Sequence, residues 1–126
     1  MSYAYVDTSI LLSLAFDETT AHKTQQRLNA FDAVYASRFL EAEYLSAFKR
    51  ESKAPVRRLL DPIQWVDATA PMRLEFSRVL DAGYVRGADC WHLATALHAA
   101  SDPAGWTFLT HDMRQRDVAK TLGFQV

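Results

Sequence analysis

Short apolar runs alternate with longer, mostly polar segments along the chain, and this alternation predicts strands separated by helices. The apolar runs are rich in aromatic and β-branched residues. They predict strands at residues 3–6, 33–36, 63–66 and 106–109, with residues 124–126 as a candidate fifth strand. Helices are expected at residues 10–15, 20–30, 38–50, 70–83, 88–100 and 113–122, with a short helix or turn at 55–60.

Capping and helix-breaking residues set the boundaries of several of these helices. Ser37 and Thr69 are expected to be N-caps, and Pro71 is expected in the first turn of the helix that Thr69 begins. Gly87 opens the clearest helix, and Gly123 ends the last one. Strands that alternate with helices imply right-handed crossovers. We therefore predict an α/β fold, a three-layer α/β/α sandwich with a short, mostly parallel sheet in one domain spanning residues 1–126.

Composition places the chain among ordinary globular proteins, with 49% hydrophobic and 23% charged residues. The longest apolar run, residues 10–16, is far shorter than the ~20 residues that span a bilayer, so no membrane contact is expected. The N-terminus has no basic region, so we expect no signal peptide. A single cysteine, Cys90, excludes an internal disulfide framework. Together these features predict a cytoplasmic protein.

Acidic residues lie where the predicted strands end. Asp7 directly follows the first strand, and Asp112 follows the fourth strand. Asp89 lies at the start of the alanine-rich helix, and Glu41 and Glu43 lie early in the helix after the second strand. Because sites in parallel sheets lie beyond the carboxyl ends of the strands, these acids are expected at one edge of the sheet.

Each acid also has a simpler structural interpretation. Asp7 could cap the first helix, Asp89 could complement a helix dipole, and Asp112 could make an Asx turn. Glu43 could lie on a solvated helix face, and periodicity does not choose between it and Glu41. Taken together, however, several carboxylates at one edge repel one another, and a divalent cation is the natural compensation. Oxygen ligands of this kind favour Mg²⁺ or Mn²⁺.

The ordered set of motifs resembles the PIN domain family, in particular the VapC-type toxins of toxin–antitoxin pairs. Residues 5–9, YVDTS, resemble the first motif, and residues 37–44, SRFLEAEY, resemble the start of the helix that carries the second acid. Residues 87–96, GADCWHLATA, resemble the third motif, and residues 108–112, FLTHD, resemble the strand that carries the fourth acid. Tyr44 and the segment 90–92 are bulkier than is usual in the family, and we expect neither departure to touch the acids.

The resemblance implies a metal-dependent endoribonuclease. Asp7, Glu43 and Asp89 would hold Mg²⁺, and Asp112 would bind through a water or a second ion. The bound cation would activate a water and cover charge on the phosphate. The hydroxyls of Ser9 and Thr110 are candidates to orient carboxylates or waters. The resemblance further implies an RNA substrate, a homodimer and a cognate antitoxin protein.

Several alternatives stay open on the sequence alone. The chain has a formal net charge of −1, so RNA contacts must come through local basic patches or bound cations. The basic stretch between Lys49 and Arg58 could steer phosphates, or be a solvated surface or a docking site for an acidic partner. His111 could transfer protons or be an ordinary loop histidine. The rival functions are another metal-dependent phosphoesterase and a catalytically decayed PIN-like module that binds RNA or metal.

Overall fold

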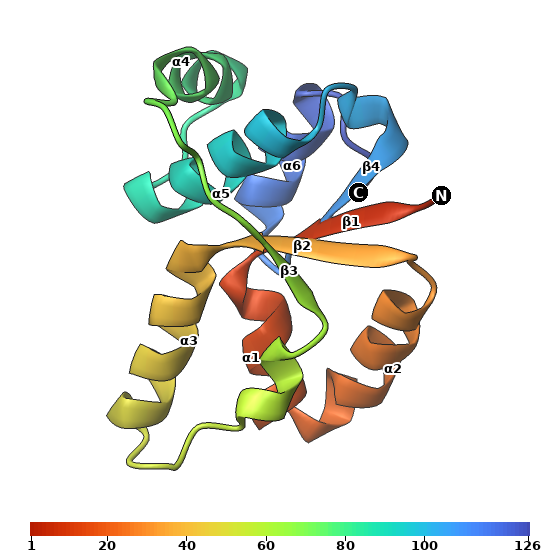
Figure 1. The fold of residues 1–126 in the computed structure, drawn as a ribbon, viewed down its shortest axis with the longest axis vertical. Helices are drawn as coiled ribbons and strands as arrows, with labels where there is room; N and C mark the ends of the chain where they lie inside the picture. Colours follow the sequence, from red (N-terminus) through yellow and green to blue (C-terminus); the bar gives the residue numbers. More distant parts are fainter.

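Four short strands form one parallel sheet in the order β3-β2-β1-β4 (Figure 1). The computed structural model describes the backbone of residues 1–126 and the side chains of residues 1–17 and 19–126. The strands are β1 (Tyr3–Val6), β2 (Ala33–Ser37), β3 (Ile63–Val66) and β4 (Trp106–Leu109). β1 pairs with both β2 and β4, and all three strand pairs are parallel. The predicted parallel sheet is therefore confirmed.

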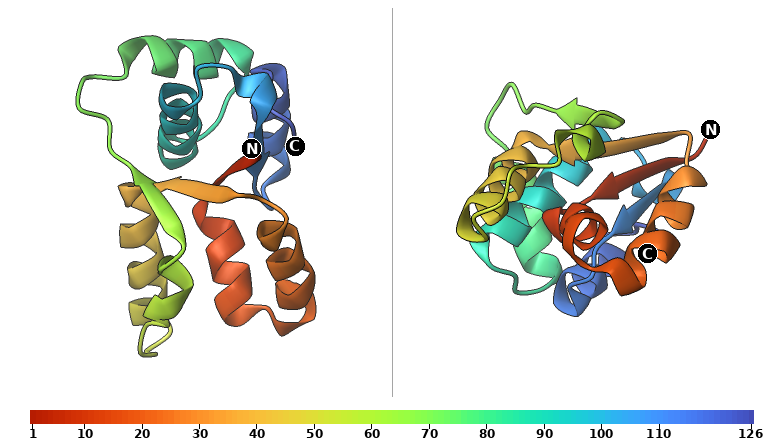
Figure 2. Two further views of the ribbon diagram at one scale, coloured as in Figure 1. Left: turned by 45° about the vertical axis from the view of Figure 1, so that its right-hand side comes forward. Right: turned by 90° about the horizontal axis from the view of Figure 1, so that it is seen from below.

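Helices cover both faces of the sheet and complete the predicted three-layer sandwich (Figure 1). One face is covered by the helices that precede β3, and the other by the helices that follow it, as the turned views also show (Figure 2). The first layer holds α1 (Thr8–Phe16), α2 (Glu18–Asn29), α3 (Arg38–Arg50) and the 3₁₀ turn η1 (Arg57–Leu60). The second layer holds α4 (Arg73–Ala82), α5 (Gly87–Ala99) and α6 (Met113–Thr121), with the 3₁₀ turn η2 (Pro103–Gly105) before β4.

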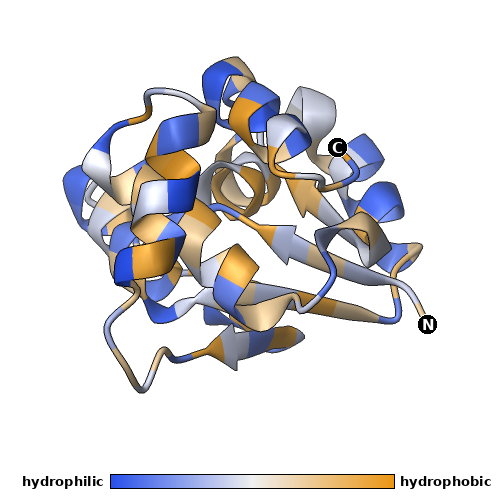
Figure 3. Ribbon diagram, turned by 90° about the horizontal axis from the view of Figure 1, so that it is seen from above, coloured by the Kyte–Doolittle hydropathy of each residue, from blue (hydrophilic) through white to orange (hydrophobic). Residues whose placement is uncertain are grey.

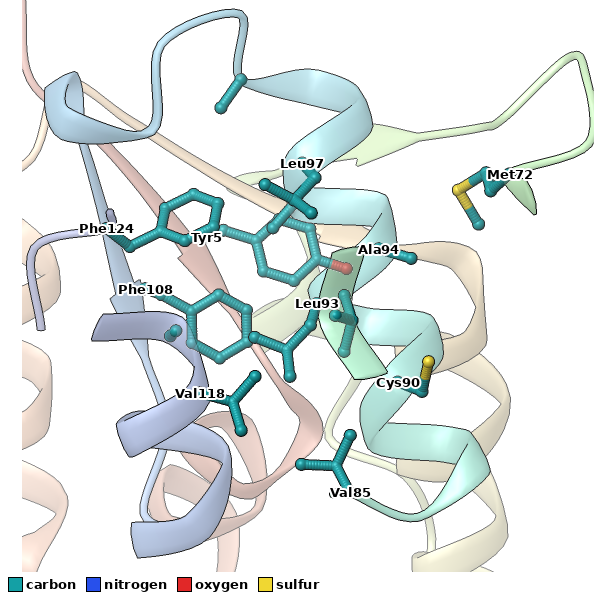
Figure 4. Close-up of a cluster of buried hydrophobic side chains, with 14 residues drawn as sticks. Tyr5, Met72, Val85, Cys90, Leu93, Ala94, Leu97, Phe108, Val118 and Phe124 are labelled. Atoms are coloured by element: carbon teal, nitrogen blue, oxygen red, sulfur yellow. The ribbon is translucent and has the colours of Figure 1, made fainter. Parts of the chain in front are cut away.

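The alternation of side chains along β1 builds a separate apolar core on each face of the sheet. Ala4 and Val6 are fully buried in the core shared with α1 and α3. Tyr5, between them, points to the opposite face. There it stacks on Phe108 with ring centroids 5.4 Å apart, among the side chains of α5 and α6 (Figure 4). β1 is therefore buried on both faces, as expected for the inner strand of a parallel sheet.

The order of the strands reverses at β1. From β1 the chain moves outward through β2 to β3, and it then returns to the other side of β1 with β4. Crossovers on opposite sides of such a switch point leave an opening beyond the carboxyl ends of the two strands that flank it, here β1 and β4. The residues that follow β1 and β4 therefore lie next to that opening.

No helix in the described part of the chain is long and apolar enough to cross a membrane. The view from above shows hydrophilic residues mixed with hydrophobic ones along the helices (Figure 3). This pattern is typical of helices that pack one face against a sheet.

Two of the predicted helix boundaries are confirmed by their hydrogen bonds. The Ser37 hydroxyl oxygen accepts a hydrogen bond from the Phe39 N–H at 3.0 Å, so Ser37 is the N-cap of α3. Gly123 follows α6 with a φ of 104°, a left-handed conformation that glycine adopts without strain. The N–H of Phe124 then donates to the Ala119 carbonyl at 3.1 Å, which closes the helix end.

Two other boundary predictions are wrong. Thr69 does not cap α4, which begins at Arg73 with Met72 in the N-cap position. Pro71 explains the later start, because a proline disfavours helical backbone at the residue before it. Residues 124–126 form no strand but a single bridge, between Thr107 and Gln125. The helix end already uses the N–H of Phe124, which leaves little backbone there for strand pairing.

We predict that Tyr5→Phe destabilises the protein by about 1–2 kcal/mol. The fully buried Tyr5 hydroxyl oxygen accepts a hydrogen bond from the Ser37 N–H at 3.0 Å and so joins β1 to the start of α3. Its removal leaves a buried N–H without a partner. Urea unfolding of the variant measures the decrease in its free energy of unfolding. Tyr3→Phe is the matched control, because the Tyr3 hydroxyl contacts only the Met1 sulfur, at 3.6 Å. Equal stability of the two variants would contradict the prediction.

Candidate active site

Four acidic side chains from four different elements line one cavity of about 400 Å³ at the carboxyl edge of the sheet. Asp7 lies between β1 and α1, and Glu43 lies one turn into α3. Asp89 lies in the first turn of α5, and Asp112 is the N-cap residue of α6. The fold thus brings together acids that are separated by up to 105 positions, 112 − 7, in the sequence. Glu41 does not line this cavity and instead pairs with Arg38 at 3.6 Å on the surface.

Asp7 is the most deeply buried of the four acids, with 5% of its surface exposed. Both carboxylate oxygens accept short hydrogen bonds. The Ser9 hydroxyl donates to Oδ1 at 2.6 Å, and the Thr110 hydroxyl donates to Oδ2 at 2.5 Å. Asp7 occupies the N-cap position of α1, but its side chain makes no capping hydrogen bond. Its carboxylate is therefore directed to the cavity rather than to the helix.

Ser9 and Thr110 also connect Asp7 to the loop after β4. The Ser9 hydroxyl oxygen accepts a hydrogen bond from the His111 N–H at 3.0 Å. The Thr110 hydroxyl oxygen accepts one from the Asp112 N–H, also at 3.0 Å. Each hydroxyl therefore has its proton committed to Asp7 and its lone pairs to the loop. This arrangement fixes the orientation of the Asp7 carboxylate from both sides.

Asp112 combines a structural contact with its place in the cavity. Its Oδ1 accepts a hydrogen bond from the Gln115 N–H at 3.0 Å, which caps α6. The Gln115 side chain is fully buried behind it and lies 2.9 Å from the Thr110 hydroxyl. The His111 side chain is directed away from the acids, with Nε2 3.1 Å from the Ser13 hydroxyl.

Glu43 is held by a histidine, contrary to our expectation that residues 90–92 would not touch the acids. His92 is 2% exposed, and its Nε2 lies 2.7 Å from Glu43 Oε1. The Thr8 hydroxyl donates to the same oxygen at 2.6 Å. The other ring nitrogen of His92, Nδ1, is buried without a hydrogen-bond partner. A hydrogen bond to the Glu43 carboxylate requires a proton on Nε2, because the carboxylate oxygen is an acceptor.

Burial and neighbouring negative charges raise the pKa values of these acids, whereas hydrogen bonds to their carboxylates lower them. Burial raises the pKa of Asp7 above its ordinary value, and Asp89 adds to the rise, while the bonds from Ser9 and Thr110 oppose it. Burial and the nearby Asp112 likewise raise the pKa of Asp89. Burial would also raise the pKa of Glu43, but hydrogen bonds from His92 and Thr8 hold it below its ordinary value. The cavity therefore concentrates negative charge that its own walls compensate only partly.

Arginine side chains surround the acids. Arg50 and Arg86 line the same cavity, and Arg114 lines an adjoining hollow together with Asp89 and Asp112. Among the basic residues between Lys49 and Arg58, Arg50 is the one that reaches the acidic cavity. A cation at the rim of an anionic cavity can attract phosphate without neutralising the acids themselves.

The donor set fits a hard divalent cation. Carboxylate oxygens are the ligands that Mg²⁺ and Mn²⁺ prefer, and such ions retain several waters rather than filling an all-protein cage. As the described side chains stand, no three His, Cys, Asp or Glu groups converge closely enough to hold one ion. Glu43 uses Oε1 for both of its hydrogen bonds. The site therefore resembles an acidic cavity that a cation and its waters would fill.

Comparison with known protein families identifies the family of the chain. A family model described as PIN domain matches residues 4–121, which is almost the whole chain. No curated protein and no solved structure matches the chain. The matched region includes the four acids and every strand of the sheet.

We predict that Asp7→Asn makes the metal-free protein more stable at pH 7.5. The raised pKa of Asp7 means that its charged form is disfavoured in the fold, so the penalty is present above the folded pKa. The gain in the free energy of unfolding should shrink as the pH falls, and it should vanish below 3.8, the ordinary pKa of an aspartate. Urea unfolding in EDTA at several pH values measures it. A gain that is unchanged at pH 3 would contradict this explanation.

We further predict that His92→Leu raises the pKa of Glu43, because burial then acts with one opposing hydrogen bond fewer. Titration of the Glu43 carboxyl carbon by NMR in metal-free protein measures the change. His98→Leu is the matched control, since His98 lies on the same helix but faces Glu75 at 4.0 Å. An unchanged Glu43 pKa in a folded His92→Leu protein would show that the contact does not act on Glu43.

Proposed function

The chain belongs to the PIN domain family, whose members are generally metal-dependent nucleases, and we propose that this protein is a metal-dependent endoribonuclease. The observation that carries the proposal is the single cavity lined by Asp7, Glu43, Asp89 and Asp112. Phosphodiester hydrolysis needs a nucleophilic water and compensation of the charge on the phosphate. An acidic cavity with arginines at its rim supplies the ligands for a cation and a path for the substrate.

Asp7, Glu43 and Asp89 would hold Mg²⁺ or Mn²⁺, with Asp112 acting through a water or a second ion. When bound, such a cation lowers the pKa of a coordinated water and covers charge on the scissile phosphate. The protein itself keeps the ligands ready. Hydrogen bonds from His92 and Thr8 keep Glu43 ionised despite its burial, which favours binding of a cation.

The remaining contacts orient the site and bring the substrate to it. Ser9 and Thr110 hold both oxygens of Asp7, so this carboxylate does not need to reorganise when a cation binds. Arg50 and Arg86 line the same cavity and would bind phosphates of the substrate. Because the chain is close to neutral overall, these local charges have to supply the attraction.

The biological role that we propose is that of the toxin in a toxin–antitoxin pair. The resemblance of the four motifs to VapC-type toxins supports this role. It also supports an RNA substrate, a homodimer, a cognate antitoxin and a cytoplasmic location. A decayed module that binds RNA or metal is the second candidate, because no three ligating groups converge in the described conformation. Another metal-dependent phosphoesterase is the third candidate.

We predict that the protein cleaves RNA in the presence of Mg²⁺ or Mn²⁺ and that EDTA abolishes cleavage. Asp89→Asn and Glu43→Gln should lower the rate about 100-fold or more, the scale on which single charge-stabilising groups act in active sites. Glu41→Gln is the matched control, because Glu41 lies on the same helix outside the cavity. Gel analysis of a panel of RNAs, with DNA and a phosphomonoester in parallel, measures the activity.

The outcomes separate the candidate functions. Cation binding without cleavage would favour the decayed module, and turnover of the phosphomonoester alone would favour another phosphoesterase. Equal loss of activity in the Glu41 and Glu43 variants would contradict the assignment of Glu43. Induced expression in cells tests the toxin role, since the wild type should arrest growth and Asp89→Asn should not.

A further inference from the structure

A second and larger cavity, of about 590 Å³, opens beside the acidic one at the carboxyl ends of β2 and β3. Its walls come from the start of α3, the segment after β3 and one face of α5, and they are mostly apolar. The aromatic side chains of Phe39 and Trp91 stand in these walls and remain 39% and 41% exposed. Pockets of this size with apolar walls and few polar groups are typical of ligand sites.

Two helices connect this apolar cavity to the acidic cavity. On α5, Ala88, Trp91 and Thr95 recur at the spacing of one helix face and line the apolar cavity. Asp89 and His92, on the neighbouring face of the same helix, line the acidic cavity. The two cavities therefore share one wall.

The rings of Phe39 and His92 complete this shared wall, with centroids 5.7 Å apart. Phe39 lines the apolar cavity and His92 the acidic one. If a phosphate of a nucleic-acid strand lies at the acids, a base next to that phosphate can therefore reach the apolar cavity.

Trp91 is held in place at one edge and open elsewhere. Its indole N–H donates a hydrogen bond to the Ser37 hydroxyl oxygen at 3.0 Å. Its ring also packs against Phe76, with centroids 5.8 Å apart. These contacts satisfy the polar atom of the indole and restrict its rotation, so the exposed part of the ring is a rigid apolar surface. Rigid aromatic surfaces of this kind stack on nucleobases.

Polar groups at the rim give this cavity the mixed character of a base site. Arg38 lines it and lies 4.9 Å from the Trp65 ring, with Asp67 3.8 Å away. A base presents an apolar face and a polar edge, so it needs both a stacking surface and hydrogen-bonding groups at the rim.

We propose that the apolar cavity binds one unpaired base of the RNA strand whose phosphate lies in the acidic cavity. The proposal rests on the proposed ribonuclease function and adds to it the position of one base beside the reacting phosphate, against the rings of Phe39 and Trp91. A base in a duplex stays stacked and paired and cannot enter a cavity in the protein wall. The occupant competing for the same surface is a second copy of this chain, which the test below distinguishes.

The test uses binding, so that it does not depend on cleavage. Asp7→Asn protein, alone and combined with Trp91→Ala or Trp91→Phe, is titrated with a fluorescein-labelled single-stranded RNA, its duplex, and copies with one abasic position. We expect Trp91→Ala to weaken binding of the single strand about tenfold and Trp91→Phe to retain most of it. Replacing one base by an abasic position should weaken binding to the protein that retains Trp91 by a similar factor. In the Trp91→Ala protein, the same abasic position should cause little further loss of binding. The duplex should bind weakly to all of them.

The controls keep the two proposals separate. Leu74→Ala is the matched control, since Leu74 is 79% exposed on α4 and lines neither cavity. Thermal melting and light scattering establish that each variant is folded and report its oligomeric state. Unchanged RNA binding in folded Trp91→Ala would overturn the base site, and a change only in oligomeric state would assign the surface to a second copy. Trp91-dependent binding in a wild type that cleaves no RNA would retain the base site and overturn the nuclease.

Discussion

The buried carboxylate of Asp7 is the constraint on which the site depends. A charge at the end of β1 with 5% exposure is costly unless several groups compensate it. Two hydroxyls, from Ser9 and Thr110, supply part of that compensation and join the first and fourth strands beyond their last residues. Burial still raises the pKa of Asp7, and the nearby charge of Asp89 adds to that rise. The fold thus maintains a charge imbalance at the place where a cation would relieve it.

The site lies where the two helical layers meet at the edge of the sheet. Glu43 comes from the first layer, and Asp89 and Asp112 come from the second layer. The contact of His92 with Glu43 joins α5 to α3 at the boundary between the two layers. The hydrogen bond from the Trp91 indole to Ser37 joins the same two helices at the start of α3. Because each layer has its own apolar core, charged groups at the boundary between the layers do not weaken either core.

Much of the fold could be predicted because periodicity and capping are local properties. The positions of the four strands, their parallel direction and the Ser37 cap follow from local patterns in the sequence, and the structure confirms them. The predicted start of α4 at Thr69 is wrong for a local reason, because Pro71 disfavours helical backbone at the residue before it, and α4 begins just after Met72. The role of His92 was missed because its partner, Glu43, lies 49 positions away in the sequence.

The sequence by itself determined which residue types end each strand, and hence that acids would gather at one edge of the sheet. The resemblance of residues 37–44 to a family motif already favoured Glu43 over Glu41, and Glu43 does line the cavity. Only the tertiary structure decided that a histidine holds Glu43 and that an apolar cavity adjoins the acids. The physical reason is that local patterning fixes where a helix begins and which of its faces is apolar. The rotation and position of that helix against its neighbours depend on side chains that interlock across layers, and these are distant in the sequence.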